Sequence, residues 1–407
     1  MEKAVQRQKI PWLVFLFSIT IVLISFVPVV FPAIVQSSDI TTSLKIPKVG
    51  PSQYETGPWA ASLIIINFIM FGLFAAYKKG KLPKNIENNL KKLFIFEISK
   101  KTAFIAMTVL LGIYVVSNAS DLGVEEKFED YTGIKNRVDV WNISQVSNAF
   151  EPHVTYFFLK ASMVLFGNYK VIPFLASIAL LLTTYFLTKK ITQKRFAGII
   201  AAIVLLQSNL FLTYDTSVAY SNFWILFYLL SLYLVYRFWP LSPISYIISI
   251  SAKALTVAFL PMSIYFVLRS DVSKKSKIIV VSSTIVIIST VGIALMSMSL
   301  GGEAAQEIFD AKEFWMGFTS FSYQLRSDGL VLLFMIPLMI GLFTVAKKGI
   351  KHGESIMILI AGILLVAPIL TGFTNQTNQP YRFMPLVVFF AIGVGVLLSK
   401  IESKILV

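Results

Sequence analysis

Five carboxylates lie within ten residues of the chain, at Asp121, Glu125, Glu126, Glu129 and Asp130. Only 14% of the 407 residues are charged, so acids are unusually concentrated here. A carboxylate can act as a general base, and a group of carboxylates can hold a divalent cation. The alternative is a solvated acidic loop with no chemistry of its own, and composition alone leaves both interpretations open.

Two cationic groups occupy positions that need an explanation. Lys253 interrupts an apolar stretch, and Arg382, preceded by Tyr381, stands at the start of the last apolar run. A charge inside a membrane costs about 2.5–3.5 kcal/mol on insertion scales and indicates a functional site by default. Arg, Lys and Tyr can bind phosphate. Alternatively, Lys253 is a snorkelling lysine near a segment end, and Arg382 pairs with a headgroup or a structural carboxylate.

Asp215 lies in a short turn between two apolar runs, in the sequence LTYDTSVAYSNF. Asp is a preferred helix N-cap, because its carboxylate accepts a hydrogen bond from a free amide of the first turn. The simpler prediction is therefore that Asp215 caps the helix that follows, and a functional role is the alternative.

The composition argues against an ordinary soluble enzyme. The chain is 56% hydrophobic, with a mean hydropathy of +0.75. It has no Cys and two His, which excludes disulfides, thiolate metal sites, a Cys nucleophile and a His-rich metal centre. It also has no P-loop, no G-x-G-x-x-G after a strand and no H-E-x-x-H motif.

Apolar runs predict an all-α polytopic membrane protein with about ten transmembrane helices, since one crossing needs about 20 mostly apolar residues. The first run follows a basic stretch but is too long for a signal peptide, so we interpret it as an anchor. The predicted crossings are 10–35, 59–77, 102–116, 171–188, 196–212, 223–236, 278–298, 330–345, 356–371 and 384–398.

Two further features are too short to cross. The segments 244–251 and 255–267 are separated at Lys253 and predict a re-entrant pair or two short crossings. The stretch 154–166 is predicted to lie along the outer face of the membrane or to dip into it.

Charge predicts the orientation. Alternate connecting segments, including both termini, carry 25 of the 36 Lys and Arg residues, and the opposite segments carry 15 of the 21 acids. The positive-inside rule then places both termini in the cytoplasm of a multi-pass plasma-membrane protein. The formal charge of +15 is thus a topology signal that matches anionic lipid, and we expect no nucleic-acid partner.

We expect two regions. Residues 1–101 form a two-span hairpin that ends in a basic stretch, and residues 102–407 form the main transmembrane domain with outer loops 117–152 and 299–328. The stretch 78–101 holds eight Lys and an amphipathic core at Ile86, Leu90, Leu93 and Phe94. It predicts an interfacial helix on the inner leaflet, with partner docking as the alternative.

Four motifs resemble the GT-C glycosyltransferases, in the branch that contains protein mannosyltransferases and lipid A aminoarabinose transferases. EPHVTYFFLKASMVLFG at 151–167 resembles their proline-containing motif and partial helix, and 172–190 is similar to their next span. SAK at 251–253 looks like a Thr-Lys motif in a paired short helix, and YRFMP at 381–385 looks like the opening of a late span. The resemblance covers about three quarters of the chain.

The resemblance implies a GT-C-like fold and sugar transfer from a polyprenyl-phosphate donor, dolichyl or undecaprenyl, to an unidentified outer-face acceptor. It places the catalytic base at Asp130 or Glu129, with inversion at the anomeric carbon. Lys253 and Arg382 would contact the lipid phosphate, and the remaining substrate contacts would be Tyr381, Glu126 and His153. The motifs require no cofactor, while the acids leave room for a divalent cation, Mg²⁺ or Mn²⁺. We expect Glu129, Asp130, Lys253 and Arg382 around one cavity that faces outward at the membrane boundary.

Two other functions stay open. A transporter or lipid flippase would place acids and broken helices at mid-membrane depth, whereas here nearly all acids fall in predicted outer loops. A non-catalytic membrane scaffold is favoured by Ser221 and Asn222, which stand where the GT-C family often has an acid.

Overall fold

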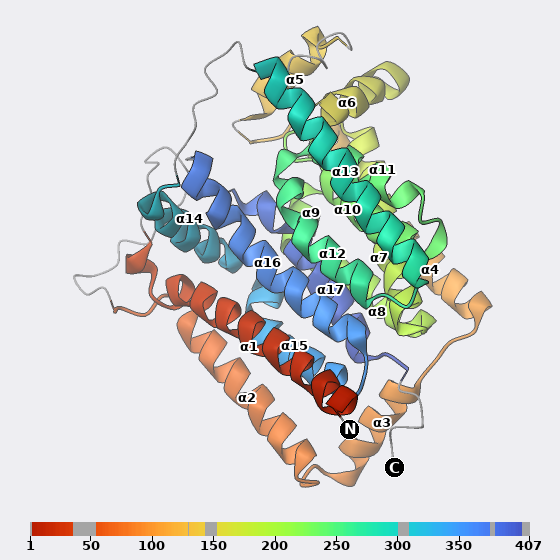
Figure 1. Ribbon diagram of the computed structural model, residues 1–407, viewed down its shortest axis with the longest axis vertical. Coiled ribbons are helices and arrows are strands. Elements are labelled where there is room, and N and C mark those ends of the chain that lie inside the picture. Colours follow the sequence, from red (N-terminus) through yellow and green to blue (C-terminus); the bar gives the residue numbers. More distant parts are fainter. Residues whose placement is uncertain are drawn as a thin grey trace. The chain divides into compact units, whose positions relative to one another are not determined.

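The computed structural model describes residues 2–35, 54–128, 130–142, 153–299, 309–374 and 379–400. Within these ranges the chain is helical and contains no β-strand (Figure 1). Seven helices are long and apolar enough to cross a membrane. They lie at Lys9–Val30, Ala60–Lys78, Lys100–Gly123, Val171–Thr192, Gly329–Lys347, Lys351–Gly372 and Pro380–Leu397. The sequence prediction of a multi-pass helical membrane protein is confirmed at this level.

The longer helices match the predicted crossings within a few residues. Seven of the ten predicted crossings coincide with the seven helices above. The other three fall on helical segments, namely α8 with α9, α10 and α13, and their crossing of the membrane stays a prediction. The stretch 154–166 is the short helix α6 (His153–Phe166).

Side-chain exposure agrees with a lipid environment. Phe68 in α2 (Ala60–Lys78) is 79% exposed, and Phe104 in α4 (Lys100–Asn118) is 73% exposed. Water would penalise such large apolar faces, whereas lipid chains accept them. The helices therefore present their apolar sides outward as well as inward.

The chain forms two compact units. Unit 1 comprises Met1–Lys100, Thr188–Leu210 and Glu307–Val407, and unit 2 comprises Lys101–Leu187 and Phe211–Gln306. The predicted boundary after residue 101 lies next to the first unit boundary, but later segments also join unit 1. The predicted division into an N-terminal hairpin and one main domain stays a prediction.

In unit 1, α16 and α17 form the centre of the packing. α16 contacts α1, α14, α15 and α17, and α17 also contacts α8. Almost every residue of α17 is buried, which explains its continuously apolar sequence. The helices of this unit are α1 (Glu2–Val30), α2, α3 (Lys84–Ile95), α8 (Arg195–Leu206), α14 (Ala311–Tyr323), α15 (Gly329–Lys347), α16 (Lys351–Thr374) and α17 (Met384–Leu397).

Aspartates begin two of these helices. Asp310 caps α14 by accepting from the Lys312 amide at 2.7 Å. Asp328 caps α15 by accepting from the Val331 amide at 3.1 Å, and it also accepts from the Ser208 hydroxyl. Two acids of the predicted 299–328 loop, Asp310 and Asp328, are thus helix caps, while Glu303 and Glu307 lie outside the described residues.

In unit 2, α11 is the shared neighbour of several short helices. It packs against α10, α6 and α13, and α12 packs against α10 and α13. The further elements are η2 (Ala119–Gly123), α5 (Asp130–Val140), α6, α7 (Val171–Thr192), α9 (Asn209–Tyr214), α10 (Phe223–Arg237), α11 (Leu241–Ala252), η4 (Ala254–Phe259), α12 (Leu260–Arg269) and α13 (Lys274–Ser299).

The predicted interruption at Lys253 is confirmed. Lys253 follows α11 in an extended backbone conformation (φ −157°, ψ 116°) and precedes η4 and α12. Its amide still donates to the Ser249 carbonyl at 3.0 Å. The helix therefore stops at this lysine, and the chain continues as a second short helix.

Candidate functional site

The acidic stretch after α4 is held at its start by residues near the beginning of α7. The Lys170 ammonium donates to the Asp121 carbonyl at 2.9 Å, and the Asn168 amide donates to the Leu122 carbonyl at 2.8 Å. Lys170 is only 6% exposed. The stretch is therefore fixed by specific contacts, and it is not a freely solvated loop.

Glu126 ties the middle of the stretch to the turn between α9 and α10. Its carboxylate accepts from the Ser217 hydroxyl at 3.1 Å and the Ala219 amide at 3.3 Å, and also from the Val218 amide. Burial raises the pKa of Glu126, while the Val218 and Ala219 amides and the Lys170 charge oppose the rise. This geometry gives Glu126 a positioning role, and its predicted contact with substrate stays a prediction.

Asp130 is exposed, as are Asp121 and Glu125, and it differs from them in contacting a packed aromatic side chain. It is the first residue of α5, and its carboxylate accepts from the Tyr220 hydroxyl at 2.7 Å. The Tyr220 ring packs edge-on against Phe128, which stacks on Tyr214. A carboxylate that is both exposed and held by a packed phenol can receive a proton from a bound molecule. Glu129, the other predicted base, lies outside the described residues.

Asp215 does not cap α10, so that prediction was wrong. The cap position belongs to Asn222, whose side-chain amide donates to the Ser177 hydroxyl at 3.0 Å. Asp215 is 1% exposed and accepts from the Tyr114 hydroxyl of α4 at 2.8 Å. The turn between Asp215 and α10 is too long for Asp215 to reach the first amides of that helix. Its carboxylate instead accepts from the phenol of Tyr114, which is 101 positions away in sequence.

Burial raises the pKa of Asp215 from 3.8 to about 6, and the hydrogen bond from Tyr114 opposes the rise. The folded state therefore holds this proton more tightly than the unfolded chain does. The stabilisation is complete below the unfolded pKa and is lost as the pH rises through the folded one. Glu126, with its raised pKa, contributes in the same direction.

We expect the unfolding free energy of the purified protein to fall as the pH rises from about 4 to about 6. A shift of about two pKa units corresponds to roughly 3 kcal/mol. Asp215→Asn should remove most of this dependence in unfolding curves recorded in detergent. Asp310→Asn is the matched control, because Asp310 is exposed. An undiminished pH dependence in Asp215→Asn would contradict the expectation.

His153 and Lys253 both lie in unit 2. His153 begins α6, and its Nδ1 accepts from the Trp141 indole at 3.0 Å. Lys253 is half-buried beside Ala252, whose carbonyl accepts from the Thr155 hydroxyl of α6 at 3.3 Å. The first turn of α6 therefore connects the surroundings of His153 to the helix break at Lys253.

Tyr381 and Arg382 lie in unit 1, in η6 (Pro380–Phe383), and both are buried. The following Phe383 stacks on Phe321 with 4.0 Å between ring centroids, which anchors this turn. Unit 2 holds Asp130, Glu126, His153 and Lys253. One cavity shared by both sets stays a prediction.

A metal centre is not evident in the part of the chain that the structure describes. No group of three His, Asp or Glu side chains there could hold a metal ion. The proposed cation thus remains a prediction from residue types alone.

The site contains partners that sequence reasoning missed. Each of these partners is far in sequence from the acid that it contacts. Tyr114 contacts Asp215, and Lys170 contacts the Asp121 carbonyl. Tyr220 and Ser217, from the turn that follows Asp215, contact Asp130 and Glu126. The concentration of polar residues in the 213–222 turn was the available signal. Comparison with known proteins adds no relative, since no family model, curated protein or solved structure matches the chain.

Proposed function

We propose that the chain is a polytopic membrane glycosyltransferase with a GT-C-like fold. It transfers a sugar from a polyprenyl-phosphate donor to an acceptor at the outer face of the plasma membrane, with both termini in the cytoplasm. The observation that carries this proposal is that two acids of the same stretch have different surroundings. Glu126 is seated in the 217–219 turn, while Asp130 stays exposed beside Tyr220.

Asp130 is the general base in this proposal. It takes the proton of the acceptor hydroxyl as the hydroxyl oxygen bonds to the anomeric carbon. The bond from that carbon to the lipid phosphate breaks, and its electron pair stays on the phosphate oxygen. Attack from the opposite side inverts the anomeric configuration. Glu129 is the alternative base because it directly precedes Asp130.

Cationic groups stabilise the departing phosphate in this mechanism. A fixed positive charge near a developing negative charge lowers the barrier, because it needs no reorganisation during the reaction. Lys253 is suited to this role, since it stands at a helix break between two short apolar helices. Arg382, Tyr381 and His153 complete the proposed substrate contacts, and the described part of the acidic stretch does not form a site for Mg²⁺ or Mn²⁺ by itself.

A transporter is the second candidate, and Asp215 is the observation that favours it. A buried acid with a pKa of about 6 can exchange a proton near neutral pH, as proton-coupled carriers require. The two functions differ in what happens to the lipid. A transferase consumes the donor and releases lipid phosphate, whereas a flippase moves the donor intact.

The experiment is a transfer assay in membranes that contain the full chain. A panel of radiolabelled polyprenyl-phosphate sugars is supplied, and label is followed into the lipid, protein and glycan fractions. We expect chain-dependent transfer from at least one donor. Intact donor that only changes leaflet would support the flippase. Donor that neither reacts nor moves would leave the scaffold as the better interpretation.

A further inference from the structure

The basic helix α3 in unit 1 presents a bare amphipathic surface. It runs from Lys84 to Ile95, and none of its residues is buried. Ile86, Leu93 and Phe94 are each more than 40% exposed. With Leu90 they follow the i, i+4, i+7, i+8 spacing of a single helix face. This face is the apolar stripe of α3.

Charge lies on the side of α3 opposite the apolar stripe, where Lys84, Asn88 and Lys92 follow each other at i, i+4, i+8 spacing. The stretch 78–101 holds eight Lys against Glu87 and Glu97. Lys91 is paired with Glu87 at 2.6 Å, one helical turn away. Lys84 and Lys92 have no ion pair among the described residues, so the helix retains positive charge at both ends.

Membrane-spanning helices flank α3 on both sides in the sequence. α2 ends at Lys78, and α4 begins at Lys100. A helix of 12 residues is about 18 Å long, well short of the roughly 30 Å hydrocarbon core. It cannot cross by itself, so its place is at a membrane face close to where these spans emerge.

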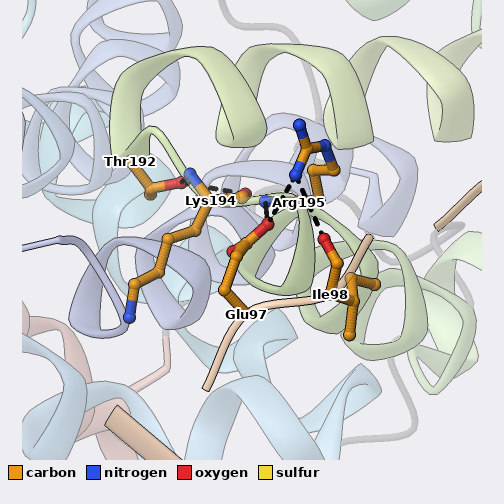
Figure 2. Close-up of polar contacts among 5 residues, drawn as sticks. All are labelled: Glu97, Ile98, Thr192, Lys194 and Arg195. Atoms are coloured by element: carbon orange, nitrogen blue, oxygen red, sulfur yellow. Dashed lines mark hydrogen bonds and ion pairs between the residues drawn. The ribbon is translucent and has the colours of Figure 1, made fainter. Parts of the chain in front are cut away.

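The C-terminal end of α3 is fastened to the turn between α7 and α8. Figure 2 shows the Arg195 amide and guanidinium donating to the Glu97 carboxylate, at 3.1 and 3.4 Å. The guanidinium also donates to the Ile98 carbonyl at 3.1 Å, and Lys194 donates to the Phe94 carbonyl. Phe96 packs edge-on against Phe196. Arg195 and Lys194 are thus bound by the Glu97 carboxylate and by backbone carbonyls, and these contacts hold the C-terminal end of α3 in place.

We propose that α3 is a docking surface for anionic lipids at the membrane face where α2 ends. Its apolar stripe enters the boundary between headgroups and acyl chains, and Lys84 and Lys92 on its polar side attract the helix to a leaflet of anionic headgroups. Charge complementarity selects this occupant, because the strong excess of Lys matches a negative leaflet. The flanking spans hold the stripe at the depth where an interfacial helix binds. This surface is independent of the proposed sugar transfer.

The absence of Cys from the chain makes a clean test available. Leu93→Cys places one thiol in the apolar stripe, and Asn88→Cys places one on the exposed opposite side of α3. Each variant of the full chain is labelled with an environment-sensitive fluorophore. The protein is then reconstituted in vesicles of phosphatidylcholine alone, or of phosphatidylcholine mixed with phosphatidylglycerol.

In the anionic vesicles we expect a blue-shifted emission at position 93 and quenching by bromine on the acyl chains, several-fold stronger than at position 88. Position 88 should stay accessible to aqueous iodide. Adding Lys84→Gln and Lys92→Gln to the Leu93→Cys variant should return its emission to the value in neutral vesicles. These substitutions are on exposed residues, and gel filtration verifies that each variant is folded.

Three outcomes would overturn the proposal. Equal iodide access at positions 93 and 88 in both vesicles would show that α3 lies in water. Equal burial of position 93 in neutral and anionic vesicles would remove the role of the headgroup charge. Protection of position 93 from both iodide and brominated lipid would indicate that protein covers the stripe.

Discussion

Asp130→Asn is expected to lower sugar transfer by about 10²–10⁴-fold, the usual contribution of a general base. Asparagine keeps the size of the side chain and can still accept a hydrogen bond from Tyr220, but it cannot take a proton from the acceptor. The rate of label transfer from the preferred polyprenyl-phosphate donor measures the effect. Binding of the donor should change little, because the base acts on the acceptor.

Glu125→Gln is the matched control for this substitution. Glu125 belongs to the same acidic stretch and is exposed like Asp130. Its substitution therefore tests whether the loss of one negative charge anywhere in the stretch is enough to lower sugar transfer. We expect it to retain near-normal transfer. If Asp130→Asn combined with Glu129→Gln transfers sugar at the normal rate, the assignment of the base to this pair is wrong. A loss only with Glu129→Gln would move the role to Glu129.

Glu126→Ala is expected to lower the free energy of unfolding by roughly 2–3 kcal/mol. The substitution removes the acceptor for Ser217, Val218 and Ala219, and hydrogen bonds to a charged group contribute about 1.5–3 kcal/mol each before partial re-solvation of the freed donors. Ser217 and Val218 are buried and Ala219 is half-buried, so only water that enters the space left by the Glu126 side chain can satisfy some of these donors. Thermal unfolding in detergent provides the measurement.

The same substitution should also reduce transfer, because the turn that carries Tyr220 loses its tie to the acidic stretch. Glu126→Gln is the companion variant, since its amide oxygen still accepts from one amide and should recover part of the stability. Glu125→Ala tests the same stretch without touching the turn. Unchanged stability in Glu126→Ala would show that the three contacts add nothing to the fold.

Local sequence patterns predicted the elements well. Runs of about 20 apolar residues identified the seven long helices, because helix length and hydrophobicity are properties of a single segment. The break at Lys253 was predictable for the same reason, since a charge between two short apolar runs marks the end of both. The surface character of α3 followed from the spacing of Ile86, Leu90, Leu93 and Phe94.

Contacts between distant segments were not predictable. The Asp215 side chain was expected to serve the next helix, yet its partner is Tyr114, 101 positions earlier. Glu126 binds amides 92 and 93 positions later in the chain. A single sequence does not show which distant segments are in contact. The residue types therefore identified the acidic stretch, but they did not distinguish a carboxylate that anchors a turn from one that is exposed.

The contact between Glu97 and Arg195 also sets an order of events during synthesis. Its two residues are 98 positions apart, so the contact has to wait until the whole of the intervening chain has been made. At about 5–20 residues per second, translation needs roughly 5–20 seconds to cover that distance. α2 and α3 therefore leave the ribosome before Arg195 exists, and α3 has to contact something other than its final partner until then. The position that α3 takes before Arg195 is made therefore cannot depend on its contact with Arg195.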